Sequence, residues 1–180
     1  HGYFSGRANF SLNKNTNKMF AEIRGDSVSV YGAPVGDMLL LGKWSEPKKR
    51  YNLLLHTYLD GTSKLAADGY YKPDSSYVDI RSTLNDLSLT YFEPFLSSVA
   101  TKTSGAINGN IRLYGPLDKL VLTGTDCCFK DFHFVLDYTK VPYTLNGPLT
   151  ISEKGIYLKN DVLKDQYGNT GTISGNITYN

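Results

Sequence analysis

The sequence predicts an all-β fold built on an antiparallel sheet, and three observations support this prediction. Residues that favour strands are abundant, with 14 Tyr and 8 Phe beside many Val, Ile and Thr. The 17 Gly residues divide the chain into segments that are too short for long helices. One seven-residue pattern also recurs, as described below. The 180 residues are enough to bury a core, and we expect a single β domain over residues 1–180.

Alternation of side chains defines the first strands. In residues 2–13, Phe4 and Phe10 belong to one side and Arg7 to the other, as in a half-buried strand. Residues 18–25 and 26–32 are predicted as two further strands, with a bend between them where Gly25 meets Asp26.

Charged and Gly-containing turns separate the next strands. Segments 37–44 and 50–59 flank a charged turn, and the dipeptide Asp60-Gly61 leads into a strand at 64–71. Asp-Gly tolerates the positive φ of tight hairpin turns, so an antiparallel meander is predicted.

A change of phase follows in residues 78–89. Val78 and Leu84 share one parity, whereas Leu87 and Leu89 have the other. A β-bulge near Asn85 and Asp86 would reconcile the two phases.

The sequence contains one predicted helix, at residues 90–100. Thr90 can cap it and Pro94 suits its first turn. The residues expected on its apolar side are Tyr91, Phe92, Phe95, Leu96 and Val99. We expect this helix to cover one end of the sheet.

Strands resume after the helix, and a repeat appears among them. The predicted strands are 105–115, 119–127, 132–138, 143–151, 155–163 and 169–180. The segment GAINGNI at 105–111 recurs as GTISGNI at 171–177, with a fainter form, GYFSGRA, at 2–8. Repetition on this scale predicts a stacked, extendable sheet.

Charge and hydropathy exclude some classes of function. The net charge is +2 and the longest basic run is Lys48, Lys49 and Arg50, which argues against nucleic-acid binding. No apolar run approaches the roughly 18 residues that cross a bilayer. Cys127 and Cys128 are adjacent, so a disulfide between them would be strained and both are expected to be free thiols.

No pattern of catalytic or metal-binding residues stands out. His1, His56 and His133 are far apart and have no metal-ligand spacing. Acidic residues at expected strand ends, Asp126, Asp131 and Asp137, are typical of solvent-facing strands rather than of a glycosidase pair. We expect no enzymatic activity, no metal and no cofactor.

The C-terminal half resembles a known family. Residues 104–122, SGAINGNIRLYGPLDKLVL, and the following Gly124 are similar to the recurring G.v.G.l.l.G.l..P.l.G pattern of the TamB C-terminal region (translocation and assembly module, DUF490), within the AsmA-like superfamily. Leu120 stands where a proline is usual. The family's D..GN.a.l.G ending is matched by Asp165, Gly168, Asn169 and Gly175. The match is strongest over 87–180 and looser over 1–86.

This resemblance implies a fold and a function. The fold would be an elongated antiparallel sheet folded lengthwise into a β-taco-like trough, with one short helix. The chain would be a non-catalytic fragment of an inner-membrane-anchored envelope protein in the periplasm, with the membrane anchor outside the fragment. Its roles would be lipid transport between membranes or outer-membrane protein translocation and assembly. Its partners would be phospholipid acyl chains or nascent outer-membrane β-strands, and an Omp85-type outer-membrane protein.

Residues on one parity of the strands would line the trough. A trough leaves these apolar side chains facing a lumen that acyl chains can fill, whereas a closed sandwich buries them in a dry core. The candidates are Ile107, Ile111, Leu113, Leu122, Phe134, Leu136, Leu145, Leu149, Ile151, Ile156, Leu158, Ile173 and Ile177. The alternative is a surface β-sandwich module that binds protein or carbohydrate, the latter through aromatic pairs such as Tyr70 with Tyr71 or Tyr91 with Phe92.

Overall fold

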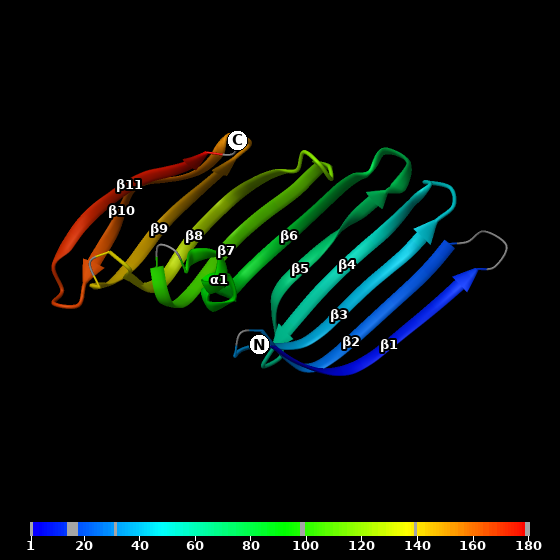
Figure 1. Ribbon diagram of the computed structural model, residues 1–180, viewed down its shortest axis with the longest axis horizontal. Coiled ribbons are helices and arrows are strands. Elements are labelled where there is room, and N and C mark those ends of the chain that lie inside the picture. The colour runs from blue at the N-terminus through cyan, green and yellow to red at the C-terminus, as the bar shows by residue number, and fades with distance from the viewer. Residues whose placement is uncertain (1, 14–17, 31, 98–99, 139, 179–180) are drawn as a thin grey trace. The chain divides into compact units, whose positions relative to one another are not determined.

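The fold is an open sheet of eleven strands. The computed structural model describes residues 2–13, 18–30, 32–97, 100–138 and 140–178 (Figure 1). The strands are β1 (Gly2–Asn13), β2 (Lys18–Val30), β3 (Ala33–Ser45), β4 (Arg50–Leu59), β5 (Thr62–Lys72), β6 (Tyr77–Ser88), β7 (Ala100–Pro116), β8 (Val121–Leu136), β9 (Pro142–Ser152), β10 (Gly155–Asp165) and β11 (Thr170–Thr178). Each strand pairs with its neighbours in sequence, in the order β1 to β11, and the antiparallel sheet is unclosed. The predicted all-β, antiparallel architecture is confirmed.

The helices among the described residues are short. They are η1 (Pro73–Ser75), η2 (Leu89–Phe92) and α1 (Glu93–Leu96). The predicted helix at 90–100 is therefore too long, and Val99 lies outside the described residues. Thr90 does not cap it: Ser88 is the N-cap of η2 and its side chain accepts the Thr90 N–H, while the Thr90 hydroxyl donates to Thr103 O at 3.1 Å. Pro94 does lie in the first turn of α1.

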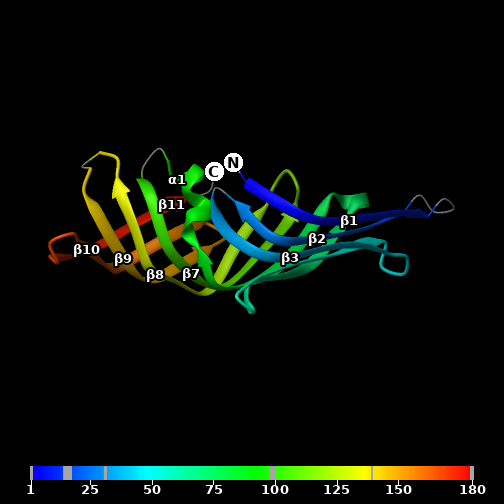
Figure 2. The ribbon, with the colours of Figure 1, turned by 90° about the horizontal axis from the view of Figure 1, so that it is seen from below.

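Two strands are longer than predicted because bulges bridge the expected breaks. Residues 18–30 form one strand, β2, with Ser27 at a φ of 54° where a bend between two strands was predicted. Similarly β8 joins the predicted strands 119–127 and 132–138, with Asp126 and Asp131 at positive φ inside it. The bulge predicted near Asn85 and Asp86 is confirmed by Asp86, whose φ is 48°. Bulges bend a strand, and Figure 2 shows β8 and β9 curving along their length.

The chain divides into two compact units. Unit 1 comprises residues 1–83 and 111–122, and unit 2 comprises residues 84–110 and 123–180. In unit 1 the buried side chains are small, among them Val28, Ala67 and Val78. Unit 2 buries larger apolar side chains, including Phe132 and Leu145. Because apolar burial stabilises in proportion to area, unit 2 has the more substantial core.

Candidate functional site

The strongest candidate site is the apolar face of unit 2, which is one side of strands β7 to β11. In the sheet register, Leu149 pairs with Leu158 and Ile151 pairs with Ile156. Leu145, at 2% exposure, pairs with Leu163 on β10. Side chains directly opposite each other on one face of a sheet are in contact. Strands β9 and β10 therefore carry a continuous apolar surface.

The structure brings most of the predicted lining residues together on this face. Its buried members are Ile107, Phe134, Leu145, Leu149 and Ile151. Half-buried members are Leu136, Ile156, Leu158 and Ile173. Ile177 pairs with Ile156 but is 67% exposed, because it lies on the edge strand β11. The remaining three, Ile111, Leu113 and Leu122, are half-buried and belong to unit 1.

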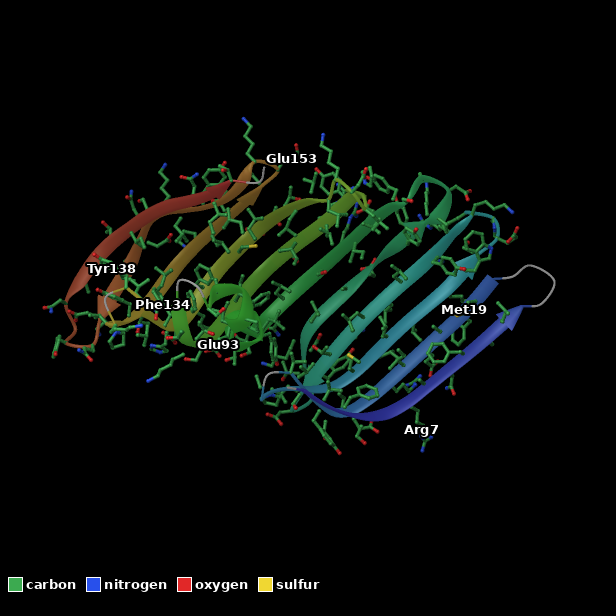
Figure 3. All side chains as sticks on the ribbon, viewed as in Figure 1. Arg7, Met19, Glu93, Phe134, Tyr138 and Glu153 are labelled. Atoms are coloured by element: carbon green, nitrogen blue, oxygen red, sulfur yellow. The ribbon has the colours of Figure 1, made fainter. Side chains whose placement is uncertain are left out.

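Sequence reasoning missed an aromatic row on this face. Phe129 and Phe132 have ring centroids 5.1 Å apart, Phe132 and Phe134 4.8 Å, and Phe134 and Tyr143 6.1 Å. Figure 3 labels Phe134 within unit 2. The bulge at Asp131 shifts the alternation of side chains along β8. Phe129 and Phe132 therefore share a face although one has an odd and the other an even position number. The density of Phe in residues 129–134 was the available signal.

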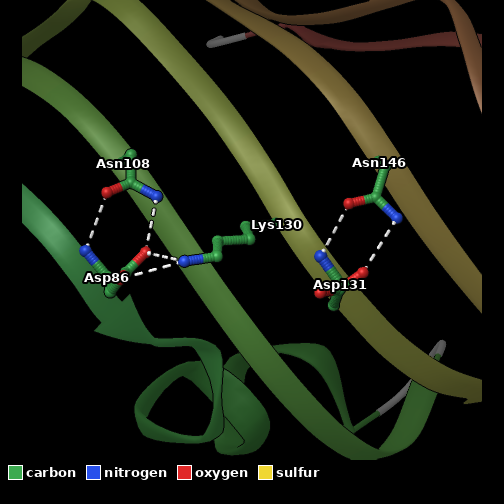
Figure 4. A network of polar contacts seen from close by, with 5 residues as sticks. All are labelled: Asp86, Asn108, Lys130, Asp131 and Asn146. Carbon is green, nitrogen blue, oxygen red and sulfur yellow. Dashed lines mark hydrogen bonds and ion pairs between the residues drawn. The ribbon is translucent and has the colours of Figure 1, made fainter.

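Three bulges of unit 2, at Asp86, Asp131 and Asn160, are each held by a reciprocal pair of hydrogen bonds to a side chain on the following strand. We call each such pair a latch, and two of the three latches appear in Figure 4. In the first, the Asp86 backbone N–H on β6 donates to Asn108 Oδ1 on β7 at 2.8 Å. The Asn108 amide donates back to Asp86 Oδ1 at 3.0 Å. Lys130 Nζ then donates to both Asp86 carboxylate oxygens, at 3.1 and 3.0 Å. Asp86, Asn108 and Lys130 thus connect three strands.

The same arrangement recurs on the next two hairpins. The Asp131 N–H on β8 donates to Asn146 Oδ1 on β9 at 2.8 Å, and the Asn146 amide donates to Asp131 Oδ1 at 3.3 Å. The Asn160 N–H on β10 donates to Ser174 Oγ on β11 at 2.9 Å, and the Ser174 hydroxyl donates to Asn160 Oδ1 at 3.2 Å. Two copies of the sequence repeat, 105–111 and 171–177, each supply a latch residue at their fourth position, Asn108 and Ser174, whereas Asn146 lies outside the repeat. Each latch consists of a bulge residue with positive φ and an Asn or Ser on the following strand.

A glycine follows the Asn or Ser of each latch, and on β7 and β9 this glycine makes room for a side chain of the next strand. A Cβ on Gly109 would lie 2.7 Å from Cys127 Sγ, and one on Gly147 would lie 2.1 Å from Asp161 Oδ1. A Cβ on Gly175, on the edge strand β11, would meet no atom within 4 Å. Cys127 and Asp161 thus occupy equivalent places, each over the glycine of the preceding strand.

Cys127 and Asp161 differ in how well their side chains tolerate burial. Burial raises the pKa of the Cys127 thiol, which lies within sulfur hydrogen-bond distance of Asn110 O at 3.7 Å. Asp161 is 1% exposed; its Oδ2 accepts the Lys159 N–H at 3.1 Å, whereas its Oδ1 has no partner among the described residues. A buried acceptor without a partner is destabilising. Asp161 is therefore a buried carboxyl side chain beside the apolar residues of β9 and β10.

The other chemical candidates form no active-site geometry. Asp126 and Asp131 lie at bulges within β8 rather than at strand ends, and Asp137 is paired with Lys140. His133 Nδ1 lies 2.7 Å from the Thr144 hydroxyl on the polar side of the sheet. Among the described residues, no group of three His, Cys, Asp or Glu side chains is placed to hold a metal.

The aromatic pairs proposed for carbohydrate recognition are not arranged as expected. Tyr70 and Tyr71 are successive residues of β5, so their side chains point to opposite faces of the sheet. Tyr91 and Phe92 lie in η2. The described part of the chain has no helix long and apolar enough to cross a membrane. No family model, curated protein or solved structure matches the chain.

Proposed function

We propose that this chain is a non-catalytic, groove-forming β module that holds apolar chains along its apolar face. In the full envelope protein these would be phospholipid acyl chains or nascent outer-membrane strands. An Omp85-type protein would be the outer-membrane partner and the periplasm the compartment, as the TamB-like sequence pattern implies.

One observation carries this proposal: the unclosed sheet presents large apolar side chains on one face, and the helices of the described residues are too short to form a second layer over it. Sheets normally bury such a face against another layer. Since the described helices are too short to cover the apolar face, the sheet can bury it by curling around its own apolar side chains or by taking up apolar material from outside. The apolar row reaches the edge strand, where Ile177 is exposed, and an acyl chain suits such a surface.

The edge strand β11 supports the second proposed ligand, a nascent outer-membrane β-strand. No atom lies within 4 Å of the place that a Cβ would take on Gly171 or Gly175 of β11, although Gly109 and Gly147, the equivalents of Gly175, are tightly covered by the following strand. An extended peptide could pair with this edge by β-augmentation. The sandwich architecture of the alternative is not the one observed, since all eleven strands belong to one sheet.

Native mass spectrometry with lipid extraction tests the proposal. We expect phospholipid to co-purify with the wild-type chain and to be lost from Leu149→Asp, with Thr150→Asp as the matched control on the opposite face of β9. Since Leu149 is buried and its variant could unfold, circular dichroism accompanies the comparison. A photoreactive residue at the exposed Ile177 supplies a second readout, which should crosslink to acyl chains. Absence of lipid and of crosslinks from the folded wild type would overturn the proposal.

A further inference from the structure

The polar side of unit 1 contains a pocket with two arginines. It is an open pocket of about 430 Å³, and its polar and aromatic lining residues are Arg50, Asn52, Asp68, Tyr70, Asp79 and Arg81. These residues come from the neighbouring strands β4, β5 and β6. We call this set the arginine pocket. Its polar residues lie on the face of β4, β5 and β6 opposite to the buried Thr57, Ala67 and Val78, because they have the other parity along the same strands.

One arginine of the pocket is held in position. The Arg50 guanidinium carbon lies 4.2 Å from the centroid of the Tyr70 ring, and Arg50 Nε donates to Asn52 Oδ1 at 3.1 Å. A cation over an aromatic face is attracted by the ring. The terminal Nη groups of Arg50 make no hydrogen bond to a described residue. They are donors that are already ordered and still available.

The carboxylate of Asp79 is already neutralised from outside the pocket. Arg112 on β7 binds it with two hydrogen bonds, Nε to Oδ1 at 2.8 Å and Nη2 to Oδ2 at 2.9 Å. The Arg112 hydrogen bond is the largest of the causes that lower the pKa of Asp79. The charges of Arg81 and Arg50 also act on Asp79, which locates both arginines near this ion pair.

The remaining charges leave the pocket cationic. Arg81 is exposed and makes no hydrogen bond to a described residue. Arg50 and Arg81 therefore oppose a single uncompensated carboxylate, that of Asp68. Lys72, with Nζ 5.6 Å from the Tyr70 centroid, adds a further positive charge nearby. Guanidinium groups present planar sets of donors that match the oxygens of phosphate.

We propose that the arginine pocket binds a phosphate ester, with Arg50 and Arg81 donating to the phosphate oxygens. Asp68 accepts a hydroxyl or ammonium group carried by the same ligand, and Tyr70 forms the wall beside the ester. Such a ligand is the headgroup of a phospholipid or a soluble phosphate ester of the same chemistry. This site is separate from the proposed apolar groove and does not depend on it.

Isothermal titration calorimetry on the whole chain tests this site with four probes. These are inorganic phosphate, sn-glycero-3-phosphoethanolamine, glycerol as the phosphate-free control, and vesicles of phosphatidylethanolamine in phosphatidylcholine. We expect saturable binding of both soluble phosphate probes, tighter for the glycerophosphodiester because of its ammonium group, and no binding of glycerol. Binding should weaken as salt concentration rises. Affinity for the vesicles as well would identify the ligand as a membrane headgroup, and binding to the soluble probes alone would identify a soluble ester.

Variants distinguish binding in the arginine pocket from nonspecific attraction to the positive charges of the surface. Arg81→Gln should weaken binding by about tenfold or more, the change expected for losing a charge-assisted hydrogen bond. Asp68→Asn should reduce the preference for the glycerophosphodiester over inorganic phosphate. The matched control is Arg7→Gln on β1, an exposed arginine away from the pocket (Figure 3). All three residues are exposed, so the variants should keep the wild-type thermal midpoint. Absence of saturable phosphate binding, or equal weakening by Arg81→Gln and Arg7→Gln, would overturn the site.

Discussion

Asp161 places a carboxylate on the apolar face of unit 2, with one oxygen that has no hydrogen-bond partner among the described residues. The equivalent place one hairpin earlier holds Cys127, a small side chain that tolerates burial. We therefore expect Asp161→Cys to raise the free energy of unfolding by about 1–2 kcal/mol, the scale of an unpaired buried acceptor. Urea unfolding measures the change.

The reciprocal substitution serves as its control. Cys127→Asp should lower the free energy of unfolding, because it creates a second buried carboxylate over Gly109. If Asp161→Cys destabilised the chain as much as Cys127→Asp does, the unpaired oxygen of Asp161 would not be a cost to the fold.

Asp79 makes the stability of unit 1 depend on pH. The hydrogen bond from Arg112 lowers the pKa of Asp79 below its ordinary 3.8 in the folded chain. A carboxyl with a depressed folded pKa contributes stability that is fully present above its unfolded pKa and is lost as pH falls through the folded value. The contribution should be on the order of 1 kcal/mol, since Arg112 is partly exposed and the pair is screened.

Asp79→Asn is the variant that reveals this contribution. Its stability deficit relative to the wild type should be constant between about pH 6 and 7 and should shrink as pH is lowered below about 4. Thermal unfolding at a series of pH values measures it. A deficit that stays the same at low pH would mean that the ion pair is not the cause.

At the scale of elements, the latches determine where each bulge sits. Asn146 both accepts the Asp131 N–H and donates to its carboxylate, so Asn146→Ala should cost about 1 kcal/mol or more. Asn146→Ser should lose less, because Ser174 makes the equivalent pair of bonds in the third latch. Amide hydrogen exchange at Asp131 should report the loss directly. Equal effects of Ala and Ser, or an equal effect of Thr150→Ala on the same strand, would argue against the latch.

The glycines that follow the Asn or Ser of each latch give a second test at this scale. Gly147→Ala should be strongly destabilising, by about 2 kcal/mol or more, because its Cβ would overlap Asp161 Oδ1 and its φ is 151°. Gly175→Ala should change stability by less than about 0.5 kcal/mol, because open space surrounds its Cβ position. Chemical unfolding of the two variants side by side measures the difference, and similar losses would contradict the assigned register.

The bulge at Asp131 shows which parts of the sheet the sequence could predict and which it could not. Strand positions were predictable because alternation is a local property, and the segment 50–59 matches β4 residue for residue. The joining of two predicted strands into β8 was not predictable, because the positive φ of Asp126 and Asp131 depends on partners in other strands, such as Asn146. The parity of Phe129 and Phe132 could not be assigned without those bulges. The lining residues Leu145, Leu149 and Ile151 were predictable because β9 has no such interruption.

At the scale of the whole molecule, the function depends on features that local patterns do not specify. Alternation predicts that a strand has an apolar side, but not what covers that side. The latches repeat along unit 2 and give each hairpin the same geometry, so the sheet grows by addition of similar parts. Glycine lets each part accept the next one closely, as Gly109 does with Cys127. A sheet assembled in this way keeps a continuous apolar face, and this continuity is what a groove for long apolar chains requires.

The division into two compact units predicts separate local stabilities. Leu145→Ala in unit 2 removes a side chain that is 2% exposed and should cost about 2–5 kcal/mol. Val78→Ala in unit 1, at 7% exposure, should cost about 1 kcal/mol or more by the same mechanism. Proteins open locally in contiguous units, so hydrogen exchange in Leu145→Ala should accelerate across β9 and β10 while β3 and β4 keep their protection. Val78→Ala should produce the opposite pattern. Acceleration spread evenly over β3, β4, β9 and β10 in both variants would instead mean that the eleven strands unfold as one cooperative sheet, in which disturbing the apolar face at one end loosens the other.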